Sequence, residues 1–220
     1  EGNNISNVSI SGIYVNGGSY GNFTDNNVTT CTSSMYGCVY VSNGADNNTF
    51  SGGNLSSISY DGIVMQGGKG NNFTGITIDS PGSDGVYLQS GSNNNLFSVF
   101  NITSATDKAF NVESSNGNGF VNNNITGSGW DYYFSSSFPR QYNFSGNSLE
   151  FITSDGAIKF LNTSLNVAGA NLSDVISVTS NKAFANSSED VGFNQSANIT
   201  LNSITVAVPV MIVDYNDDGS

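Results

Sequence analysis

The stretch "SYDGIVMQGGKGNNFTGITIDS", residues 59–80, is followed after one proline by "GSDGVYLQSGSNNNLFSVFNIT", residues 82–103. Both stretches have a short alternation of apolar and polar residues, then a turn of Gly, Ser and Asn, then a phenylalanine and a further short apolar pattern. The same order recurs along the first 160 residues at a spacing of 22 to 25 residues. A repeat of this length is typical of a solenoid, in which each repeat forms one coil.

Each repeat contains three short strand patterns separated by turn residues. The first pattern opens after dipeptides such as Gly12-Ile13 and Gly62-Ile63, and Gly156-Ala157 continues this series. The second pattern has one phenylalanine in each repeat: Phe23, Phe50, Phe73, Phe97, Phe120 and Phe144. The third lies near Val28, Leu55, Ile76, Ile102, Ile125 and Leu149. A single coil cannot bury its apolar row alone, so the pattern predicts six or seven stacked coils about 4.8 Å apart, a β-helix.

The "DGIVM…NNFTGITI" and "DGVYLQ…NNNLF" units resemble the repeats of right-handed parallel β-helix proteins. In particular they are similar to those of Asn/Ser/Thr-rich surface proteins of archaea. The resemblance covers about residues 5–165. It implies an all-β, right-handed parallel β-helix of about 24 residues per coil over residues 1–165, with residues 166–220 as a C-terminal β segment. Members of this class include polysaccharide lyases and hydrolases, viral tailspikes, adhesins and envelope proteins, so the fold does not define the function.

The charge balance excludes several classes of partner. The chain has 17 acidic residues, 5 Lys and Arg and no His, for a net charge of −12. Nucleic acid is excluded because the chain cannot neutralise phosphates.

The apolar run "VAVPVMIV", residues 206–213, is too short to span a bilayer and contains Pro209.

Two features are typical of an extracellular protein. Cys31 and Cys38 are the only cysteines, and a disulfide between them would stabilise the fold by about 2.5 kcal/mol. The alternative is an inward Cys38 with a free thiol at Cys31. The chain also has fifteen Asn-x-Ser/Thr sequons, which predict N-glycosylation: Asn4, Asn7, Asn22, Asn27, Asn47, Asn54, Asn72, Asn101, Asn124, Asn143, Asn162, Asn171, Asn186, Asn194 and Asn198. The same pattern also suits a solvated strand, where Asn and Thr face outward.

A column of carboxylates is expected before the first strand of successive repeats, from Asp61, Asp84, Asp107, Asp131 and Asp155. The column could bind backbone N–H groups at turns, hold a cation, or supply an acid and a base for glycoside hydrolysis. The turn role is favoured, because Asp before a turn commonly accepts backbone N–H groups and no second carboxylate column faces this one. The absence of His and the scattered basic residues disfavour catalysis. Lys108 beside Asp107 is the nearest approach to a lyase-like pair. We therefore expect no enzyme activity and no required cofactor.

Aromatic residues offer a candidate surface for glycan contact. Tyr14, Tyr40 and Tyr87 are expected to point outward from their strands, and Trp130 lies in the dense stretch "WDYYF". Such rings can stack on sugars, although Tyr is also a common residue on half-exposed strands.

The C-terminal segment offers a candidate cation loop and an assembly element. Asp214, Asn216 and Asp218 follow the spacing of the first half of a Ca²⁺ loop, although an acidic turn-rich tail explains them as well. The stretch "TVAVPVMIV" is apolar on both faces, so it must be buried, either as a cap on its own core or as a strand added to a neighbour.

The sequence as a whole favours an extracellular, cell-surface structural glycoprotein that assembles with itself into a filament, sheath or S-layer. A carbohydrate-binding adhesin for a surface polysaccharide is the alternative, and a polysaccharide lyase or hydrolase is favoured less.

Overall fold

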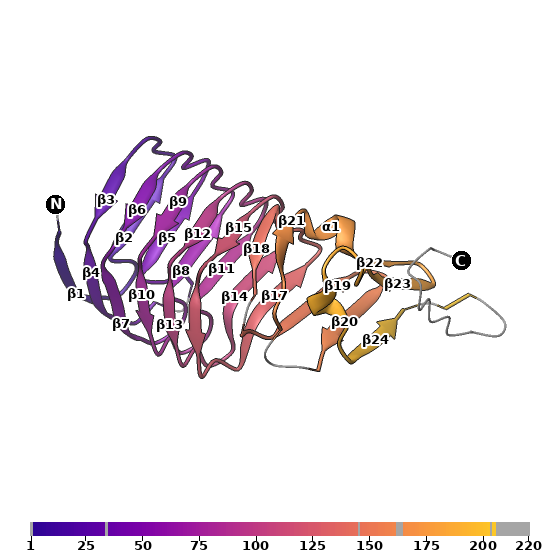
Figure 1. Cartoon of the computed structure of the whole chain (residues 1–220). Coiled ribbons are helices and arrows are strands. Elements are labelled where there is room, and N and C mark those ends of the chain that lie inside the picture. Colours follow the sequence, from indigo (N-terminus) through magenta and orange to yellow (C-terminus); the bar gives the residue numbers. More distant parts are fainter. Residues whose placement is uncertain (1, 34, 145, 162–164, 203, 206–220) are drawn as a thin grey trace.

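A computed structural model describes residues 2–33, 35–144, 146–161, 165–202 and 204–205. The chain winds into a stack of coils, and each coil contributes one strand to each of three sheets, which we name A, B and C (Figure 1). Sheet A has the order β1 (Asn4–Val8), β4 (Asn27–Cys31), β7 (Asn54–Ile58), β10 (Thr77–Asp79), β13 (Asn101–Thr103) and β16 (Asn124–Thr126). All neighbouring strands of sheet A are parallel.

Sheet B is the longest of the three and runs through the whole stack. Its order is β2 (Ile13–Asn16), β5 (Val39–Ser42), β8 (Ile63–Gln66), β11 (Val86–Gln89), β14 (Lys108–Glu113), β17 (Trp130–Ser135), β19 (Leu149–Thr153), β20 (Gly156–Phe160) and β24 (Ala197–Leu201). Sheet C contains β3 (Asn22–Thr24), β6 (Thr49–Ser51), β9 (Asn72–Thr74), β12 (Leu96–Ser98), β15 (Gly119–Val121), β18 (Gln141–Asn143) and β21 (Ala168–Ala170). The predicted all-β parallel β-helix is confirmed.

Phenylalanine rings stack through the centre of the molecule. Successive ring centroids from Phe23 to Phe50, Phe73, Phe97 and Phe120 are 4.7, 4.4, 5.0 and 5.6 Å apart. The column then continues with Tyr142, which pairs in register with Phe120. Phe144, predicted to continue the column, lies beside it, with its ring 5.0 Å from that of Tyr142. Because each strand pairs without a register shift, identical side chains meet on successive coils.

A ladder of buried asparagines runs along the corner before sheet C. It consists of Asn48, Asn71, Asn95 and Asn118, each about 1% exposed. The Oδ1 atom of Asn71 accepts the backbone N–H of Asn48 (2.8 Å), and that of Asn95 accepts the N–H of Asn71 (2.8 Å). The amide nitrogens donate to backbone carbonyls inside the corner, as Asn71 does to Ala45 (2.9 Å). The ladder thus satisfies backbone groups that the turn removes from the sheets.

The structure joins Cys31 to Cys38 by a disulfide bond, and both residues are buried. The bond closes a corner loop between sheets A and B, on the outside of which Met35 is 69% exposed. Both sulfur atoms therefore lie in the core, and Cys38 points inward.

The regular coil ends earlier than the sequence pattern predicts. β20 pairs antiparallel with β19, so the prediction that Gly156-Ala157 opens a further parallel coil is wrong. Leu149 begins β19 in sheet B, not a third strand in sheet A. The chain turns back at Ser154 and Asp155, which form a tight hairpin loop.

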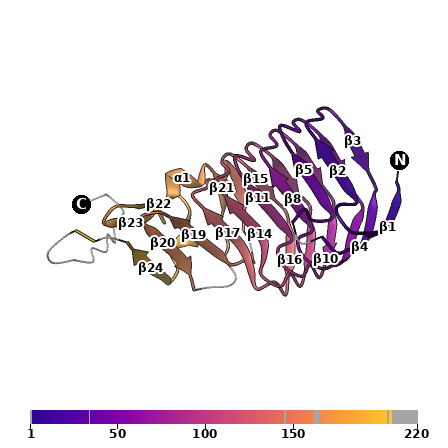
Figure 2. The same ribbon diagram turned by 180° about the vertical axis from the view of Figure 1, so that it is seen from behind.

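Residues after the hairpin cover the C-terminal end of the core. The short helix α1 (Leu172–Val175) and the hairpin of β22 (Ile176–Thr179) and β23 (Lys182–Ala185) lie at this end in both views (Figures 1 and 2). A 3-10 turn at Val191–Phe193 follows the hairpin along the chain. Leu165, Leu172, Ile176 and Phe193 are buried in the same core as the coils. The described part of the C-terminal segment is therefore a cap, and the apolar run 206–213 lies outside the described residues.

Candidate functional site

The outer face of sheet B carries most of the predicted site residues. One outward column contains Tyr14, Tyr40, Val64, Tyr87, Asn111 and Tyr133 in register. Tyr14 and Tyr40 are neighbours, with ring centroids 5.2 Å apart. Tyr14 is 53% exposed but Tyr40 only 6%. Val64 separates this pair from Tyr87, so the predicted tyrosines do not form one continuous platform.

Trp130 lies in register with Lys108 near one edge of the same face. The Nζ atom of Lys159 is 4.2 Å from the centroid of the indole, a cation–π contact. The ring is half-buried, and Lys159 occupies one of its faces. Trp130 thus belongs to the packing of β17 against the hairpin, and a sugar could not stack on the face that Lys159 covers.

The predicted column of five carboxylates does not form. Asp61 and Asp84 lie in register, but the next coil places Lys108 at that position and shifts Asp107 by one residue. Asp131 is shifted in the other direction and accepts the backbone N–H of Ser148 (2.7 Å). Asp155 lies in the β19–β20 loop. The coils vary by one residue in length, and one residue is enough to move a side chain out of a column.

Asp61 and Asp84 bind the backbone of the following coil. Asp61 Oδ1 accepts the N–H of Asp84 (2.9 Å), and Asp84 Oδ1 accepts the N–H of Lys108 (3.0 Å). As in the predicted turn role, these carboxylates accept backbone N–H groups. However, each accepts an N–H group of the next coil instead of one in its own turn.

Asp84 is the most perturbed of these carboxylates. It is 4% exposed, and its Oδ2 accepts the amide of Asn111 (2.7 Å). Burial raises its pKa from 3.8 to about 6, and the hydrogen bond from Asn111 only partly opposes this effect. Burial also raises the pKa of Asp61. An ionised Asp84 is thus costly to the fold at neutral pH.

We expect Asp84→Asn to stabilise the protein at pH 7. The folded state binds the Asp84 proton more tightly than the unfolded state, so the stability due to neutral Asp84 is complete below pH 3.8 and is lost as the pH rises through about 6. The loss at pH 7 is about 3 kcal/mol, since one unit of pKa corresponds to about 1.4 kcal/mol. Asn111, whose Oδ1 has no hydrogen-bond partner, can rotate its amide to accept from the new one at position 84.

Urea unfolding at pH 7 and pH 4 measures this effect. The variant should be more stable than the native chain at pH 7 and nearly equal to it at pH 4. Asp107→Asn is the matched control, because the Asp107 side chain is 60% exposed and its ion pair with Lys108 contributes little. An equal gain in both variants, or a gain that persists at pH 4, would contradict the assignment to Asp84.

Three further side chains on this face, those of Asn111, Glu113 and Tyr133, were not among the residues predicted from the sequence. The hydroxyl of Tyr87 donates to Glu113 Oε2 (2.9 Å). The Lys108 ammonium pairs with Asp107 and lies 4.9 Å from the ring centroid of Tyr133. On later coils the position of Tyr87 is occupied by Asn111 and then by Tyr133, and Glu113 occupies the position of Gln89. Alignment of the repeats in register would therefore have identified all three.

Cation ligands do not gather in the described part of the chain. Within it, no group of three or more His, Cys, Asp or Glu side chains is placed to hold a metal ion. The candidate Ca²⁺ ligands Asp214, Asn216 and Asp218 lie outside the described residues. In addition, no helix among the described residues has the length and hydropathy that a membrane crossing requires.

Among the described sequons, every acceptor asparagine is exposed or half-exposed. Those exposed at the surface include Asn4, Asn7, Asn22, Asn47, Asn124, Asn171, Asn194 and Asn198; those half-exposed are Asn27, Asn54, Asn72, Asn101, Asn143 and Asn186. Asn162 lies outside the described residues. The outward position of these side chains is compatible with modification and with a solvated strand face alike.

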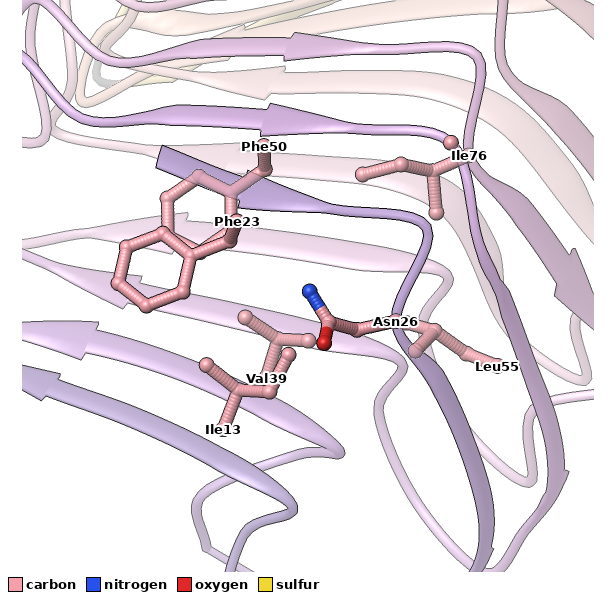
Figure 3. Close-up of a pocket in the computed structure, with 8 residues that line it drawn as sticks. Ile13, Phe23, Asn26, Val39, Phe50, Leu55 and Ile76 are labelled. Carbon is pink, nitrogen blue, oxygen red and sulfur yellow. The ribbon is translucent and has the colours of Figure 1, made fainter. Parts of the chain in front are cut away.

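A pocket lies inside the first coils, lined mainly by apolar residues that include Ile13, Phe23, Val39 and Phe50 (Figure 3). Asn26, Gly53, Ile76 and Phe100 share one position in the register of successive coils. The Oδ1 of Asn26 accepts the amide of Asn3 (2.8 Å). With one amide and no charged side chain in its lining, this pocket is a packing gap rather than a chemical site.

The comparison with family models agrees with this architecture. Residues 1–167 match the family described as "Right handed beta helix region", and the chain belongs to this family. Searches of curated proteins and of solved structures each found no match. The family includes enzymes and non-enzymes, so its function must be inferred from the surface of this chain.

Proposed function

We propose that this chain is a structural subunit of an extracellular glycoprotein assembly, in which β-helices join end to end in a filament, sheath or surface layer. The observation that carries the proposal is the direction of β24. β20 runs antiparallel to β19, and β24 runs antiparallel to β20. Two reversals restore the direction, so β24 runs parallel to β2 at the other end of sheet B.

This geometry lets sheet B continue from one molecule to the next. Within the described residues β2 and β24 are the two end strands of the sheet, and each pairs on one side. A second copy translated along the stack would present its own β2 to β24 as a parallel neighbour. Head-to-tail contacts between copies related by such a translation do not close into a ring and generate filaments. A chain with additional coils before Glu1 would offer the same parallel edge on its first coil.

The surface supports an extracellular location. The chain is rich in sequons whose described asparagines face outward, and it contains a disulfide bond. Ile199 in β24 is 57% exposed, which leaves an apolar side chain at the open edge. Natural proteins cover or pair such edges. We place the protein at the cell surface, with a second copy as its principal partner.

Negative-stain electron microscopy of the native protein tests the proposal. We expect filaments or sheets, and Ile199→Lys should disperse them because a charge at the edge opposes strand pairing. Val191→Lys is the matched control, since Val191 is 79% exposed but lies outside sheet B. Monodisperse particles of the native protein would overturn the proposal. Loss of order in EDTA alone would add a Ca²⁺ requirement, for which Asp214, Asn216 and Asp218 are the candidates.

A carbohydrate-binding adhesin is the second candidate, and the cluster of Tyr14, Tyr36 and Tyr40 favours it. The ring of Tyr40 contacts those of Tyr14 and Tyr36, with centroids 5.2 and 4.9 Å away, so a buried ring holds two partners at the surface. Tyr14→Ala should weaken retention of a surface polysaccharide more than Trp130→Ala, because Lys159 covers one face of Trp130. A native protein that retains no glycan would remove this candidate.

We propose further that the chain does not catalyse polysaccharide cleavage. The carboxyl group with the most suitable pKa for a general acid, that of Asp84, is 4% exposed and bound to Asn111 and Lys108. A bound polysaccharide could not reach it without displacing these groups. Cleavage of any polysaccharide, lost in Asp84→Asn, would refute this statement.

A further inference from the structure

The outer face of sheet A carries five sequon asparagines in one column. The column reads Asn4, Asn27, Asn54, Thr77, Asn101 and Asn124, one residue from each successive strand. Each of the five asparagines is exposed or half-exposed. Glycosylation at all five would place sugars on three consecutive strands before Thr77 and on two consecutive strands after it, in one straight row.

Strand spacing sets a limit on this row. Neighbouring strands are about 4.8 Å apart, so neighbouring acceptors stand at about that distance and every second acceptor at about 9.6 Å. A pyranose ring with its hydroxyl groups is wider than the shorter spacing. Two glycans on adjacent strands would therefore compete for one volume, whereas glycans on every second strand would not.

Hydrogen bonds within the column distinguish the two members of each adjacent pair. Asn27 Nδ2 donates to Asn4 Oδ1 (2.9 Å), and Asn124 Nδ2 donates to Asn101 Oδ1 (2.8 Å). The Nδ2 atom is the one that a glycan modifies. In each pair, the nitrogen of the donor residue is held against its neighbour's side chain, while the acceptor residue contributes its oxygen and leaves its nitrogen outside this contact.

We infer that N-glycans on this face occupy every second coil, at Asn4, Asn54 and Asn101, and that Asn27 and Asn124 stay unmodified in the folded protein. Thr77 lies between Asn54 and Asn101 in the column, so glycosylated and unmodified positions alternate along all six strands. Sheet C follows the same rule, since its sequon residues Asn22 and Asn72 are separated by Thr49. The inference rests on the proposed extracellular glycoprotein, and it adds the sites and their spacing.

The modification is an ordinary glycosyl transfer. The bond that forms joins the asparagine Nδ2 to C1 of the first sugar, and the bond that breaks joins that carbon to the phosphate of a lipid-linked oligosaccharide. The amide loses one proton and the lipid phosphate is released. The modified amide keeps one N–H, but a sugar on Asn27 or Asn124 would have to fit beside the neighbouring side chain to which that nitrogen is bonded.

Glycopeptide mass spectrometry of the protein from its own cells tests the inference site by site. We expect glycans on Asn4, Asn54 and Asn101 and none on Asn27 or Asn124. Glycans on both members of a pair, or on Asn27 and Asn124 instead of their partners, would overturn the inference and leave the glycoprotein proposal intact. A protein without a glycan at any sequon would refute both.

Two variants separate the hydrogen-bonded pair from general crowding. Asn4→Ala removes a sequon and the acceptor of Asn27, so Asn27 should gain a glycan. Asn54→Ala removes the sequon on the other side of Asn27 but keeps the bond to Asn4, so Asn27 should stay unmodified. Gain at Asn27 in both variants, or in neither, would contradict the role of the Asn4–Asn27 bond.

Discussion

Phe97→Ala is expected to lower the free energy of unfolding by about 4 kcal/mol, because it removes a fully buried ring from the centre of the stack. Phe97 has no exposed surface. Its ring contacts Phe73, Phe120, Phe100 and Phe110, with centroids 5.0 to 6.0 Å away. The coils above and below are held in register by the backbone, so they cannot collapse into the cavity.

Phe23→Ala provides the matched control, since Phe23 belongs to the same column but lies in the first coil. Its ring stacks on Phe50 alone (4.7 Å) and is half-buried. Its loss should cost less than half as much, because one side of the cavity is open to solvent. Urea unfolding followed by circular dichroism measures both variants. Equal losses would show that a ring between two neighbouring coils, such as Phe97, stabilises the fold no more than a ring in the first coil, such as Phe23.

The coiled architecture could be predicted from the sequence because every coil repeats the same requirement. A coil must bury an inward row, and only an equivalent row above or below can cover it. Residues such as Ile63, Val86 and Phe110 therefore recur at the period of the coil and pair in the structure without a shift. The phenylalanine column was predictable for the same reason.

The end of the stack was not predictable from the same signal. Asp61-Gly62 and Asp155-Gly156 are identical dipeptides before an apolar alternation. The first leads into a parallel strand, and the second follows a tight turn into an antiparallel one. The difference lies in the residues available to cover the last coil, Leu165 to Phe193, whose contacts are non-local.

The candidate surface was predicted only in part, because side-chain columns depend on single-residue register. Asp107 lies 23 residues after Asp84, as Asp84 does after Asp61, yet Asp107 is outside the column. β14 begins at Lys108, two residues before its inward Phe110, and this shifts the preceding carboxylate. Spacing along the chain therefore identifies candidates, but strand pairing decides which of them meet.

Asn71→Ala is expected to cost about 4 kcal/mol although it removes no apolar surface. The side chain of Asn71 accepts the backbone N–H and the amide of Asn48 (2.8 and 3.1 Å) and donates to the carbonyl of Ala45 (2.9 Å). Its removal leaves the Asn48 N–H and the Ala45 carbonyl buried without these partners. Each unsatisfied group costs about 1 to 3 kcal/mol, and a methyl group cannot replace either bond.

Asn124→Ala separates this effect from the general loss of an asparagine. Asn124 also bonds to an asparagine on the neighbouring coil, but it is exposed and water can replace the bond. We expect a change within about 0.5 kcal/mol, as for other surface substitutions. The measurement is urea unfolding of the unglycosylated chain, so that sugars do not differ between variants. If the two variants lose similar stability, the ladder of buried asparagines does not stabilise the corner. The stability of the coils must then come from strand pairing and the phenylalanine column alone.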